Sequence, residues 1–581
     1  MNRLSIYLKK YTKEAVLAPV FKLLEALMDL LVPLVVAHII NNGITLNDRQ
    51  AILYSFILLI VLAFAGMGFS FTAQYFAAKA SVGFAADLRQ SLFDHIMSLT
   101  YKELDKSGID TLITRMTSDI NQLQVGLNLA LRLLLRSPFI VFGAMIMAFT
   151  IDVKLALIFV VTIPVLSLVV YAIMLKSIPL FEKVQIKLDA LLGMTRENLT
   201  GVRVIRAFCK EEDEISEFTD RSSSLTLMNK TVGRLSALMN PVTYVIINVA
   251  SIILIYYGAI KVDTGLLKQG DIVALYNYMA QIIVELIKLA SLTITINKSL
   301  ACGKRVASLF EVKPSLVYPE SDSTETESEY EVEFANVSFA YEKGIDAISN
   351  VSFKSLKGQT VGVIGSTGSG KSTIVNLIPR FYDVDEGAVL VDGKNVKDYT
   401  RKALLEKIAI VPQKAVLFEG TIRENMLWGK DDASDEEIYE ALETAQALEV
   451  VSNKDKGLDS VVEQNGRNFS GGQRQRLTIA RAIVKKPQIL ILDDSSSALD
   501  FATDARLRKA IHELSEKMSV FIVSQRTSSI MNADLILVMD DGRLVGQGTH
   551  EELLKHSKVY QEIYYSQFPE EKDKKEEVAY A

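Results

Sequence analysis

Cysteine is scarce in this sequence, and so is any excess of positive charge. Among 581 residues only Cys209 and Cys302 occur, so no disulfide framework is indicated and we expect both to be reduced thiols in cytoplasmic helices. The formal net charge is −6, which gives no reason to expect nucleic-acid binding. A nucleic-acid partner is therefore not predicted.

A cleavable signal sequence is not indicated either. Lys9, Lys10 and Lys13 precede the first apolar run, but no A-x-A-type site follows a short apolar core. We therefore expect this run to stay as a membrane span. Apolar residues make up 49% of the chain and the mean hydropathy is +0.23, which indicates a membrane fraction. The length suggests two or three domains.

Six apolar runs in the first half are long enough to cross about 30 Å of hydrocarbon at roughly 1.5 Å per residue. We expect spans near 15–40, 51–78, 128–150, 153–177, 238–262 and 272–297. The loops after the second and fourth spans are long and basic, whereas the others are short and poor in Lys and Arg. By the positive-inside rule both termini and both long loops are cytoplasmic.

The two long loops lack Pro/Gly clusters and keep a helical periodicity. A helix running from about 153 to 205 would reach roughly 75 Å, far beyond the bilayer. The spans are therefore expected to continue into the cytosol as rods, with tips at 108–115 and 198–208.

Several ionisable residues lie inside the expected spans. Lys22, Glu25 and Asp29 are spaced i, i+3 and i+7, so they share one helix face, and Glu285 and Lys288 are three apart in the sixth span. Charges at such depth should face the bundle interior, a water-filled cavity or one another. Two interpretations stay open: Glu25 or Asp29 recognises a cationic substrate, or these residues satisfy each other or a neighbouring helix.

The composition changes after residue 310. Pro314 and Pro319 lead into an acidic stretch rich in Ser and Thr, which cannot bury apolar surface and is typical of a connector. We expect a membrane domain over 1–310, a linker over 311–329, a second domain over 330–568 and a disordered tail over 569–581. Alternating strands and helices indicate an α/β core in the second domain.

A glycine-rich loop follows a predicted strand in this domain and matches G-x-x-x-x-G-K-[ST]. Glycines let backbone N–H groups turn inward around phosphate oxygens, and the next helix points its positive end at the anion. Lys371 is expected to neutralise β/γ-phosphate charge and Ser372 to ligate Mg²⁺. The predicted phosphate loop consists of Gly365, Ser366, Thr367, Gly368, Ser369, Gly370, Lys371, Ser372 and Thr373.

A second apolar strand, Ile489–Leu492, ends in Asp493 and Asp494. Carboxylates at the carboxyl end of a parallel strand can face a magnesium nucleotide, and we expect Asp493 to hold the metal opposite Ser372. The stretch Asn468–Asp500, which contains this strand, carries Ser470, Gly471, Gly472 and Gln473 near its start.

These motifs, in this order, resemble those of the ABC exporter family. The resemblance implies a half-transporter: an all-α six-helix transmembrane domain fused to an α/β P-loop, RecA-like nucleotide-binding domain with a helical subdomain. It implies that Tyr341 stacks on adenine, that Gln413 meets Mg²⁺ and the attacking water, and that Ser470, Gly471, Gly472 and Gln473 are the signature that contacts ATP on a paired chain. The expected cofactors are ATP and Mg²⁺. The rod tips resemble the family's coupling helices, and the segment 417–425 is expected to touch them.

Three positions depart from the family's pattern. The family usually has Glu after the metal-binding Asp, and here the residue is Asp494, whose carboxylate is retracted by roughly 1.5 Å. The family's switch His is replaced by Gln525, which cannot become cationic. The usual acidic loop residue also aligns with Gln464. These replacements predict a pocket that binds ATP well and cleaves it slowly.

A heterodimer would place the intact signature against a partner's competent site, whereas a homodimer would hold two slow sites. We expect a heterodimeric exporter of amphiphilic or drug-like compounds in the bacterial cytoplasmic membrane, with its nucleotide-binding domain in the cytosol. Its partners would be a second half-transporter, membrane lipid and a small amphiphilic substrate. A lipid flippase, a peptide exporter and a regulatory ATP-sensing subunit remain as alternatives.

Overall fold

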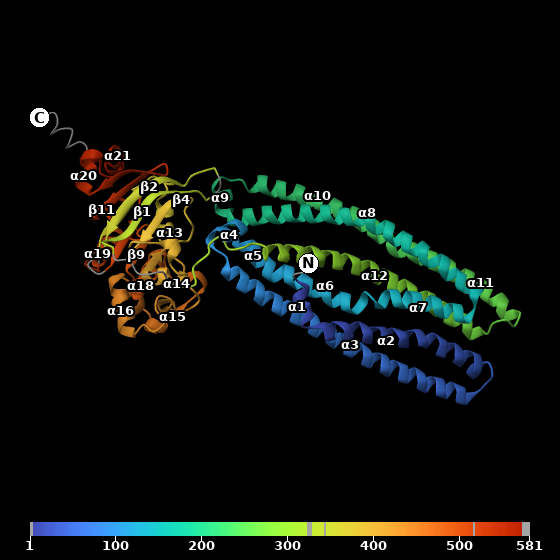
Figure 1. Cartoon of the computed structure of the whole chain (residues 1–581). Coiled ribbons are helices and arrows are strands. Elements are labelled where there is room, and N and C mark those ends of the chain that lie inside the picture. Colours follow the sequence, from blue (N-terminus) through green and yellow to red (C-terminus); the bar gives the residue numbers. More distant parts are fainter. Residues whose placement is uncertain (1–3, 322–327, 342–343, 515–517, 572–581) are drawn as a thin grey trace. The chain divides into compact units, whose positions relative to one another are not determined.

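The computed structural model describes residues 4–321, 328–341, 344–514 and 518–571. It divides into two compact units, one formed by Met1–Ser98 with Gly108–Lys313 and the other by Leu99–Ser107 with Pro314–Ala581 (Figure 1). Part of the expected linker over 311–329 and most of the expected tail over 569–581 lie outside the described residues. The first unit is helical, and the second combines two larger sheets with helices.

The first unit contains six helical segments that are long and apolar enough to cross a membrane, as the sequence predicts. Two of them are continuous helices of 50 and 48 residues, α3 and α8, and at about 1.5 Å per residue each is longer than a bilayer is thick. The elements are α1 (Ser5–Lys9), α2 (Thr12–His38), η1 (Ile39–Ile44), α3 (Arg49–Ser98), α5 (Ile109–Thr114), η2 (Arg115–Asp119), α6 (Ile120–Leu133), α7 (Arg136–Ile151), α8 (Val153–Thr200), α9 (Val202–Ala207), α10 (Glu211–Ala237), α11 (Met239–Asp263) and α12 (Gln269–Leu309).

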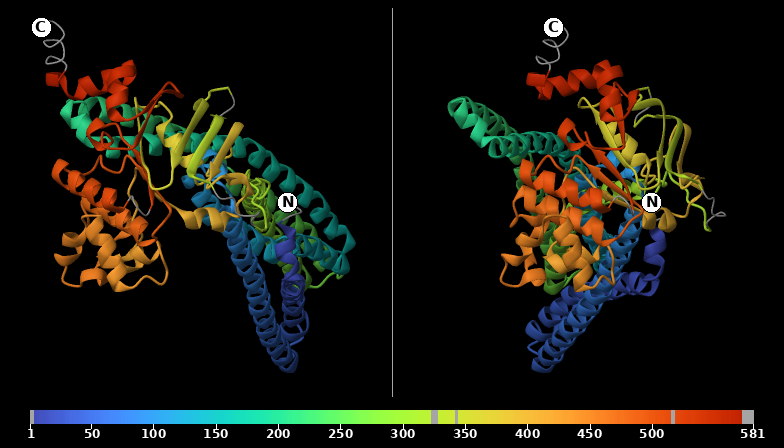
Figure 2. Two further views of the ribbon diagram at one scale, coloured as in Figure 1. Left: turned by 60° about the vertical axis from the view of Figure 1, so that its left-hand side comes forward. Right: turned by 90° about the vertical axis from the view of Figure 1, so that its left-hand side faces the viewer.

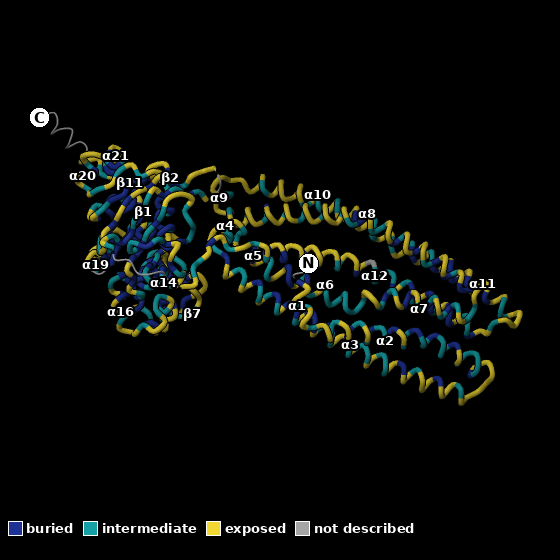
Figure 3. Tube along the Cα trace, viewed as in Figure 1, coloured by how far each residue is buried: buried dark blue, intermediate teal, exposed yellow. Residues whose placement is uncertain are grey.

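Small residues let these helices approach closely. Ala26, Ala144 and Ala156 are fully buried at the centre of the apolar cluster that joins α2, α7, α8, α11 and α12. A Cβ added at Gly270 would lie 2.4 Å from the carbonyl oxygen of Ala37, so α12 begins directly against α2. Most large apolar side chains instead face outward, and Figure 3 shows long exposed stretches along α3 and α8. This is the distribution expected where lipid replaces water around the helices.

The second unit contains a six-stranded sheet in the order β12-β11-β3-β10-β9-β6, in which β12 is antiparallel and the other five strands are parallel. A four-stranded antiparallel sheet has the order β2-β1-β4-β5, and β7 pairs with β8. The strands are β1 (Tyr330–Phe339), β2 (Ile348–Leu356), β3 (Thr360–Gly365), β4 (Glu386–Val391), β5 (Lys394–Asn395), β6 (Ile408–Val411), β7 (Gly420–Thr421), β8 (Val461–Val462), β9 (Ile489–Asp493), β10 (Ser519–Val523), β11 (Leu535–Asp540) and β12 (Arg543–Gly548).

Helices complete this unit and share its two main apolar cores. One core joins the two larger sheets to α13, and the other packs α15, α16, α17 and α18 against the β6 side of the parallel sheet. Figure 2 shows this helical part (orange) beside the strands. The helices are α4 (Tyr101–Ser107), α13 (Lys371–Leu377), η3 (Val396–Asp398), α14 (Arg401–Lys407), α15 (Ile422–Leu427), α16 (Asp435–Thr444), α17 (Leu448–Ser452), η4 (Gly457–Asp459), η5 (Gln464–Gly466), α18 (Gly471–Val484), α19 (Phe501–Leu514), η6 (Thr527–Ser529), α20 (His550–His556) and α21 (Lys558–Gln567).

Candidate nucleotide-binding site

Four parallel strands end side by side and gather the predicted site residues at one edge of the sheet. Val523 of β10 pairs with Val363 of β3 on one side and with Asp493 of β9 on the other, and β6 lies beyond β9. The residues that follow these strands therefore meet at the carboxyl edge, where nucleotides bind to open α/β sheets. The phosphate loop, Asp494, Gln525 and Gln413 all follow one of the four strands.

The phosphate loop connects β3 to α13 and depends on glycine geometry. Gly368 and Gly370 have φ angles of 82° and 93°, which L side chains rarely adopt. A Cβ at Gly365 would lie 2.1 Å from the carbonyl oxygen of Met539, so only glycine fits there. The hydroxyl oxygen of Ser369 is buried and has no hydrogen-bond partner among the described residues. The loop is thus shaped by close backbone approach and keeps a free polar atom.

Lys371 is folded into this loop. Its Nζ donates hydrogen bonds to the carbonyl oxygens of Gly365 at 2.9 Å and Ser366 at 2.6 Å. Burial lowers the pKa of the Lys371 ammonium, and the charges of Asp494 and Asp493 oppose that shift. A buried cation that is held only by carbonyl dipoles favours the arrival of an anion such as phosphate.

Ser372 and Asp493 lie together, as the sequence predicts for a pair facing one metal ion. The Ser372 hydroxyl donates to Asp493 Oδ1 at 2.9 Å, and burial raises the pKa of the Asp493 carboxyl. One hydroxyl and one carboxylate are hard oxygen donors that suit Mg²⁺, which takes much of its remaining shell from phosphate and water. No group of three or more His, Cys, Asp or Glu capable of holding a metal by itself occurs in the described part of the chain. The residues therefore fit a metal that arrives with nucleotide.

Asp494 contacts Gln413. Its backbone has φ 46° in the left-handed region, and its N–H donates to the carbonyl oxygen of Val523 at 3.0 Å. The Gln413 side chain donates from Nε2 to Asp494 Oδ2 at 3.3 Å. The two residues that the sequence assigns to metal, water and hydrolysis are thus hydrogen-bonded to each other across the ends of β6 and β9.

Gln525 follows β10 with an exposed side chain, and its backbone is held from a distant helix. Gln567, the last residue of α21, donates from Nε2 to the carbonyl oxygen of Gln525 at 2.8 Å. Its Oε1 accepts the N–H of Thr527 at 2.9 Å. Gln567 is not predicted from the sequence, because no motif marks it and 42 residues separate it from Gln525.

The predicted adenine-stacking residue, Tyr341, is 42% exposed. Its hydroxyl shares a hydrogen bond of 3.3 Å with Thr373 of the phosphate loop. Its ring meets the rings of Phe339 and Tyr382 edge-on, with centroids 4.9 and 5.2 Å away. The ring is therefore positioned from three sides and still offers surface to a ligand.

Helix α4 belongs to this unit, although it lies within the first half of the chain. The Tyr101 ring stacks on Phe381 with centroids 4.3 Å apart, and the Tyr382 hydroxyl donates to Asp105 Oδ2 at 2.6 Å. Burial and this hydrogen bond raise the pKa of Tyr382. An aromatic contact and a hydrogen bond thus connect the ring of Tyr341 to α4 through Tyr382.

The region of the first predicted rod tip is divided between the two units. The predicted stretch 108–115 forms α5 and the start of η2 in the first unit, whereas 99–107 is the part that joins the ATPase fold. The ring contacts of α4 are with Phe381 and Tyr382, and contact of the rod tips with the segment 417–425 stays a prediction. The second predicted tip, 198–208, contains the end of α8, Gly201 and α9.

The predicted signature opens α18. The Ser470 hydroxyl accepts the N–H of Gln473, and the Gln473 side chain accepts the N–H of Ser470, which forms a capping box. Ser470 and Gly471 are exposed, and a Cβ at Gly471 would meet no atom within 4 Å. The N-terminus of α18 is therefore rigid and accessible, as an anion-binding helix end must be.

Six ionisable residues of the membrane spans are paired with one another in the described part of the chain. Arg136 donates to Glu285 at 2.7 Å and to Asp29 at 2.9 Å, Lys22 donates to Glu25 at 2.5 Å, and Lys288 donates to Glu285 at 3.0 Å. We call this set the membrane ion network; it consists of Lys22, Glu25, Asp29, Arg136, Glu285 and Lys288. The geometry favours the interpretation that these residues satisfy each other, and a substrate role for Glu25 or Asp29 stays a prediction.

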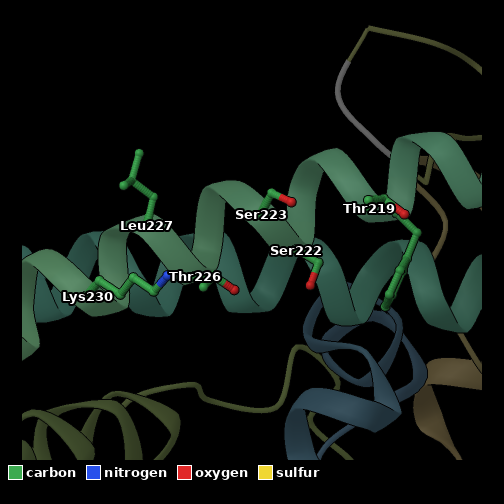
Figure 4. A pocket seen from close by; sticks show the side chains of 7 residues that line it. Thr219, Ser222, Ser223, Thr226, Leu227 and Lys230 are labelled. Atoms are coloured by element: carbon green, nitrogen blue, oxygen red, sulfur yellow. The ribbon is translucent and has the colours of Figure 1, made fainter.

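A surface hollow of about 390 Å³ lies along α10 (Figure 4). It is lined by Phe218, Thr219, Ser222, Ser223, Thr226, Leu227 and Lys230. These residues recur every three or four positions, so they share one face of the helix. The hollow contains no carboxylate and no metal-ligating cluster, and nothing in it resembles a catalytic site.

Comparison with known proteins decides the family. Residues 16–286 match the ABC transporter transmembrane region, and residues 348–497 match the ABC transporter ATPase family. The chain is 35% identical over 574 residues to the uncharacterized ABC transporter ATP-binding protein YfiB of Bacillus subtilis, covering 98% of this chain and 99% of that protein. The chain belongs to the ABC exporter family.

The chain is also similar to two further relatives and to one solved structure. It is 32% identical to the putative multidrug export ATP-binding/permease protein YgaD of Bacillus subtilis, over 97% of this chain and 98% of that protein. It is 33% identical to an ATP-dependent lipid A-core flippase of Desulfotalea psychrophila, over 83% and 84%. The fold matches a bacterial Atm1-family ABC exporter with ATP bound, with a TM-score of 0.78, 23% identity and coverage of 96% and 98%.

These findings confirm the class of protein that the motifs predict. The exporter is an ATP-driven transporter with an all-α membrane domain and a C-terminal α/β ABC domain. It is a multi-pass inner-membrane protein whose ABC domain lies in the cytosol. Half-transporters of this kind usually work as dimers and act on substrates in the membrane.

Proposed function

We propose that this exporter moves amphiphilic or drug-like compounds across the bacterial cytoplasmic membrane as one subunit of a heterodimer, and that its own ATP site is degenerate. The observation that carries the proposal is the contact between Asp494 and Gln413, because the short carboxylate is held by an amide at 3.3 Å. The binding side of the same site is complete. Binding without efficient cleavage is the property that a degenerate site requires.

The chain's own residues supply the binding. Lys371 can exchange its carbonyl partners for phosphate oxygens, which are stronger acceptors for an ammonium. Tyr341 offers an aromatic face to adenine, and the Ser372–Asp493 pair can take one Mg²⁺, which would supply charge neutralisation at the phosphates.

Hydrolysis is the weakened step. A general base needs a heavy-atom reach of about 2.6 to 3.2 Å to the water, and Asp494 is roughly 1.5 Å shorter than Glu. A misplacement of about 1 Å can reduce a rate on the order of 100-fold. Gln525 can donate a hydrogen bond to a phosphate but cannot carry the positive charge that a His can. Both changes slow cleavage and leave binding intact.

The signature supports a heterodimer over a slow homodimer. Its capped helix end at Ser470 is intact, so it can complete a competent site on a paired chain. ATP binding would then bring two ABC domains together. Asp105 and Tyr101 attach α4 to Tyr382 and Phe381 of the ABC domain, so α4 would transmit that movement to α3 and α5. Cleavage at the partner's site would reset the transporter.

The experiment is to purify the tagged chain from its native membranes with whatever half-transporter accompanies it, and to measure ATP turnover. Asp494→Asn is expected to leave turnover within about twofold, because the partner's site performs most of the cleavage. Asp494→Glu with Gln525→His should raise it, since both weakened elements are restored. Collapse of turnover with Asp494→Asn, or brisk turnover by the chain paired with itself, would refute the degenerate heterodimer.

A lipid flippase is the second candidate. It is favoured by the similarity to a protein named as a lipid A-core flippase and by charged side chains buried in the spans, which suit a ligand with a polar head. Transfer of a labelled phospholipid between leaflets of reconstituted vesicles would separate the two candidates, because a drug exporter need not move lipid.

A further inference from the structure

The membrane ion network is electrically balanced. Its three cations, Lys22, Arg136 and Lys288, face three carboxylates, Glu25, Asp29 and Glu285, and every carboxylate accepts from at least one cation. Ser70 and Ser137 add hydrogen bonds to the ends of the network at 3.3 and 2.7 Å. The network therefore has no carboxylate left without a cation among the described residues.

Arg132 is a cation of the third span that does not belong to this network. It lies near the end of α6, four residues before Arg136, and its Nε is buried. It makes no hydrogen bond or ion pair with any residue that the structure describes. The buried Nε of Arg136 also lacks an acceptor in the described part of the chain. Arg132 lies in α6 and Arg136 opens α7, and the two residues between these helices keep right-handed helical backbone angles. The two donors are therefore about one helical turn from each other.

The depth of Arg132 limits what can neutralise it. The sequence predicts that the third span begins near residue 128 on the cytoplasmic side, so Arg132 is expected to lie roughly 6 Å into the membrane at about 1.5 Å per residue. Lys22, at the network's inner end, lies roughly 10 Å into the first span by the same measure. This is the inner boundary between headgroups and hydrocarbon, where a charged side chain needs a counter-ion or water.

The chemistry of guanidinium selects an oxyanion. Its planar fork of N–H donors matches phosphate and carboxylate geometry, and it is less strongly hydrated than an ammonium. We propose that Arg132, together with the free Nε of Arg136, binds the phosphate or carboxylate headgroup of an anionic amphiphile that enters from the inner leaflet. This inference rests on the proposed export of amphiphiles and names the charge of the cargo. It reverses the sign expected from Glu25 and Asp29, because Lys22 and Arg136 occupy those carboxylates.

The test is a binding measurement on the tagged chain with its accompanying half-transporter, in nanodiscs of phosphatidylcholine. Phosphatidylglycerol and dodecanoate serve as the phosphate and carboxylate probes, with dodecyl maltoside and dodecyltrimethylammonium as the neutral and cationic probes. Arg132→Gln is expected to weaken binding of an anionic probe about tenfold or more, because a charge-assisted contact is lost. Arg132→Lys keeps the charge but not the fork and should lose less.

Lys176→Gln is the matched control, because it removes a cation from an exposed position of α8 near the inner end of a span. It should leave the affinity for both anionic probes unchanged. Loss with phosphatidylglycerol alone would support a lipid headgroup as the ligand, and loss with dodecanoate alone would support an amphiphilic acid.

Unchanged affinity for both anionic probes in Arg132→Gln would overturn the inference, and so would preferential binding of the cationic probe by the unmodified chain. A lower melting temperature of the complex with unchanged probe affinities would also overturn it, since Arg132 would then be pairing with protein. If Arg132→Gln fails to assemble, Arg132→Lys carries the same comparison. Failure of every probe to stimulate ATP turnover would instead refute the proposed export, while the binding results would still decide the role of Arg132.

Discussion

The two charged regions of this chain use the same residue types in opposite ways. At the carboxyl edge of the parallel sheet, Asp493 and Asp494 are held by a hydroxyl and an amide, so their negative charge remains available. In the membrane ion network, Asp29 and Glu285 are held by Arg136, so their charge is neutralised. A carboxylate bound by neutral donors is suited to receive a cation, whereas one bound by a cation joins helices together.

Removal of Arg136 is expected to have the largest effect. Arg136→Ala would leave Asp29 and Glu285 with reduced pairing in a low-dielectric environment, and we expect a loss of about 3–5 kcal/mol of stability. The melting temperature of the purified complex measures this loss. Arg136→Met combined with Asp29→Asn and Glu285→Gln removes both signs together and should recover most of it. Equal destabilisation by the single and the triple variant would show that packing, not charge, holds these helices.

On the ATPase side, Lys371→Ala should weaken ATP binding to this chain's own site by roughly 1.5–3 kcal/mol, or about 10- to 100-fold, because a charge-assisted contact to phosphate is lost. Binding of a fluorescent ATP analogue to the complex measures it, with the partner's site blocked by substitution of its corresponding lysine. Lys402→Ala, which removes an exposed cation from α14, is the control and should leave binding unchanged. Equal affinity in Lys371→Ala would contradict the assigned phosphate loop.

Substitution of Tyr382 tests whether the nucleotide site at the carboxyl edge of the parallel sheet is coupled to α4. Tyr382→Phe keeps the ring beside Tyr341 and removes the hydrogen bond to Asp105, which we expect to contribute about 0.5–1.5 kcal/mol. Substrate stimulation of ATP turnover should fall about two- to tenfold while ATP affinity stays the same. Asp105→Asn keeps an acceptor oxygen and should lose less than Asp105→Ala. A fall in ATP affinity without loss of stimulation would mean that Tyr382 only supports the adenine site.

The smallest expected effect is at Gln567. Its amide bridges the carbonyl oxygen of Gln525 and the N–H of Thr527, and we call residues 525–527 the switch segment. The background for this test is a variant that carries Asp494→Glu and Gln525→His. In it, Gln567→Ala frees the segment and should lower turnover by less than about tenfold, with little change in KM. Gln567→Glu keeps an acceptor for the Thr527 N–H but replaces the donor with a charged oxygen, so it should retain part of the activity. Identical results for Ala and Glu would contradict a positioning role.

The difference between the two regions also explains what the sequence could predict. Short motifs place several site residues at the ends of strands or at the start of a helix, and backbone hydrogen bonds set their positions. These residues are the phosphate loop, Asp493 and Gln413 at strand ends and Ser470 at the start of α18. The six spans were predicted because length and apolarity alone define them. These features depend on local sequence, so they can be inferred without tertiary contacts.

The rest depends on residues far apart in the chain. Asp29, Arg136 and Glu285 come from three helices, and spacing along one helix cannot show which partner each one meets. Gln567 reaches Gln525 from the C-terminal helix, again without a motif. The assignment of 99–107 to the ATPase unit could not be predicted either, because both 99–107 and 108–115 are largely helical and only the contacts of α4 with Phe381 and Tyr382 show where it belongs.

Leu99–Ser107 belongs to the ATPase unit, and this determines where the chain can be cut or fused to a relative. A soluble ATPase fragment that begins at Pro314 would lack α4, and the rings of Phe381 and Tyr382 would be left facing solvent. Such a fragment should self-associate more readily than the intact chain. Chimaeras that exchange membrane domains between relatives would work best when this short helix is inherited together with the ATPase domain rather than with the spans that flank it.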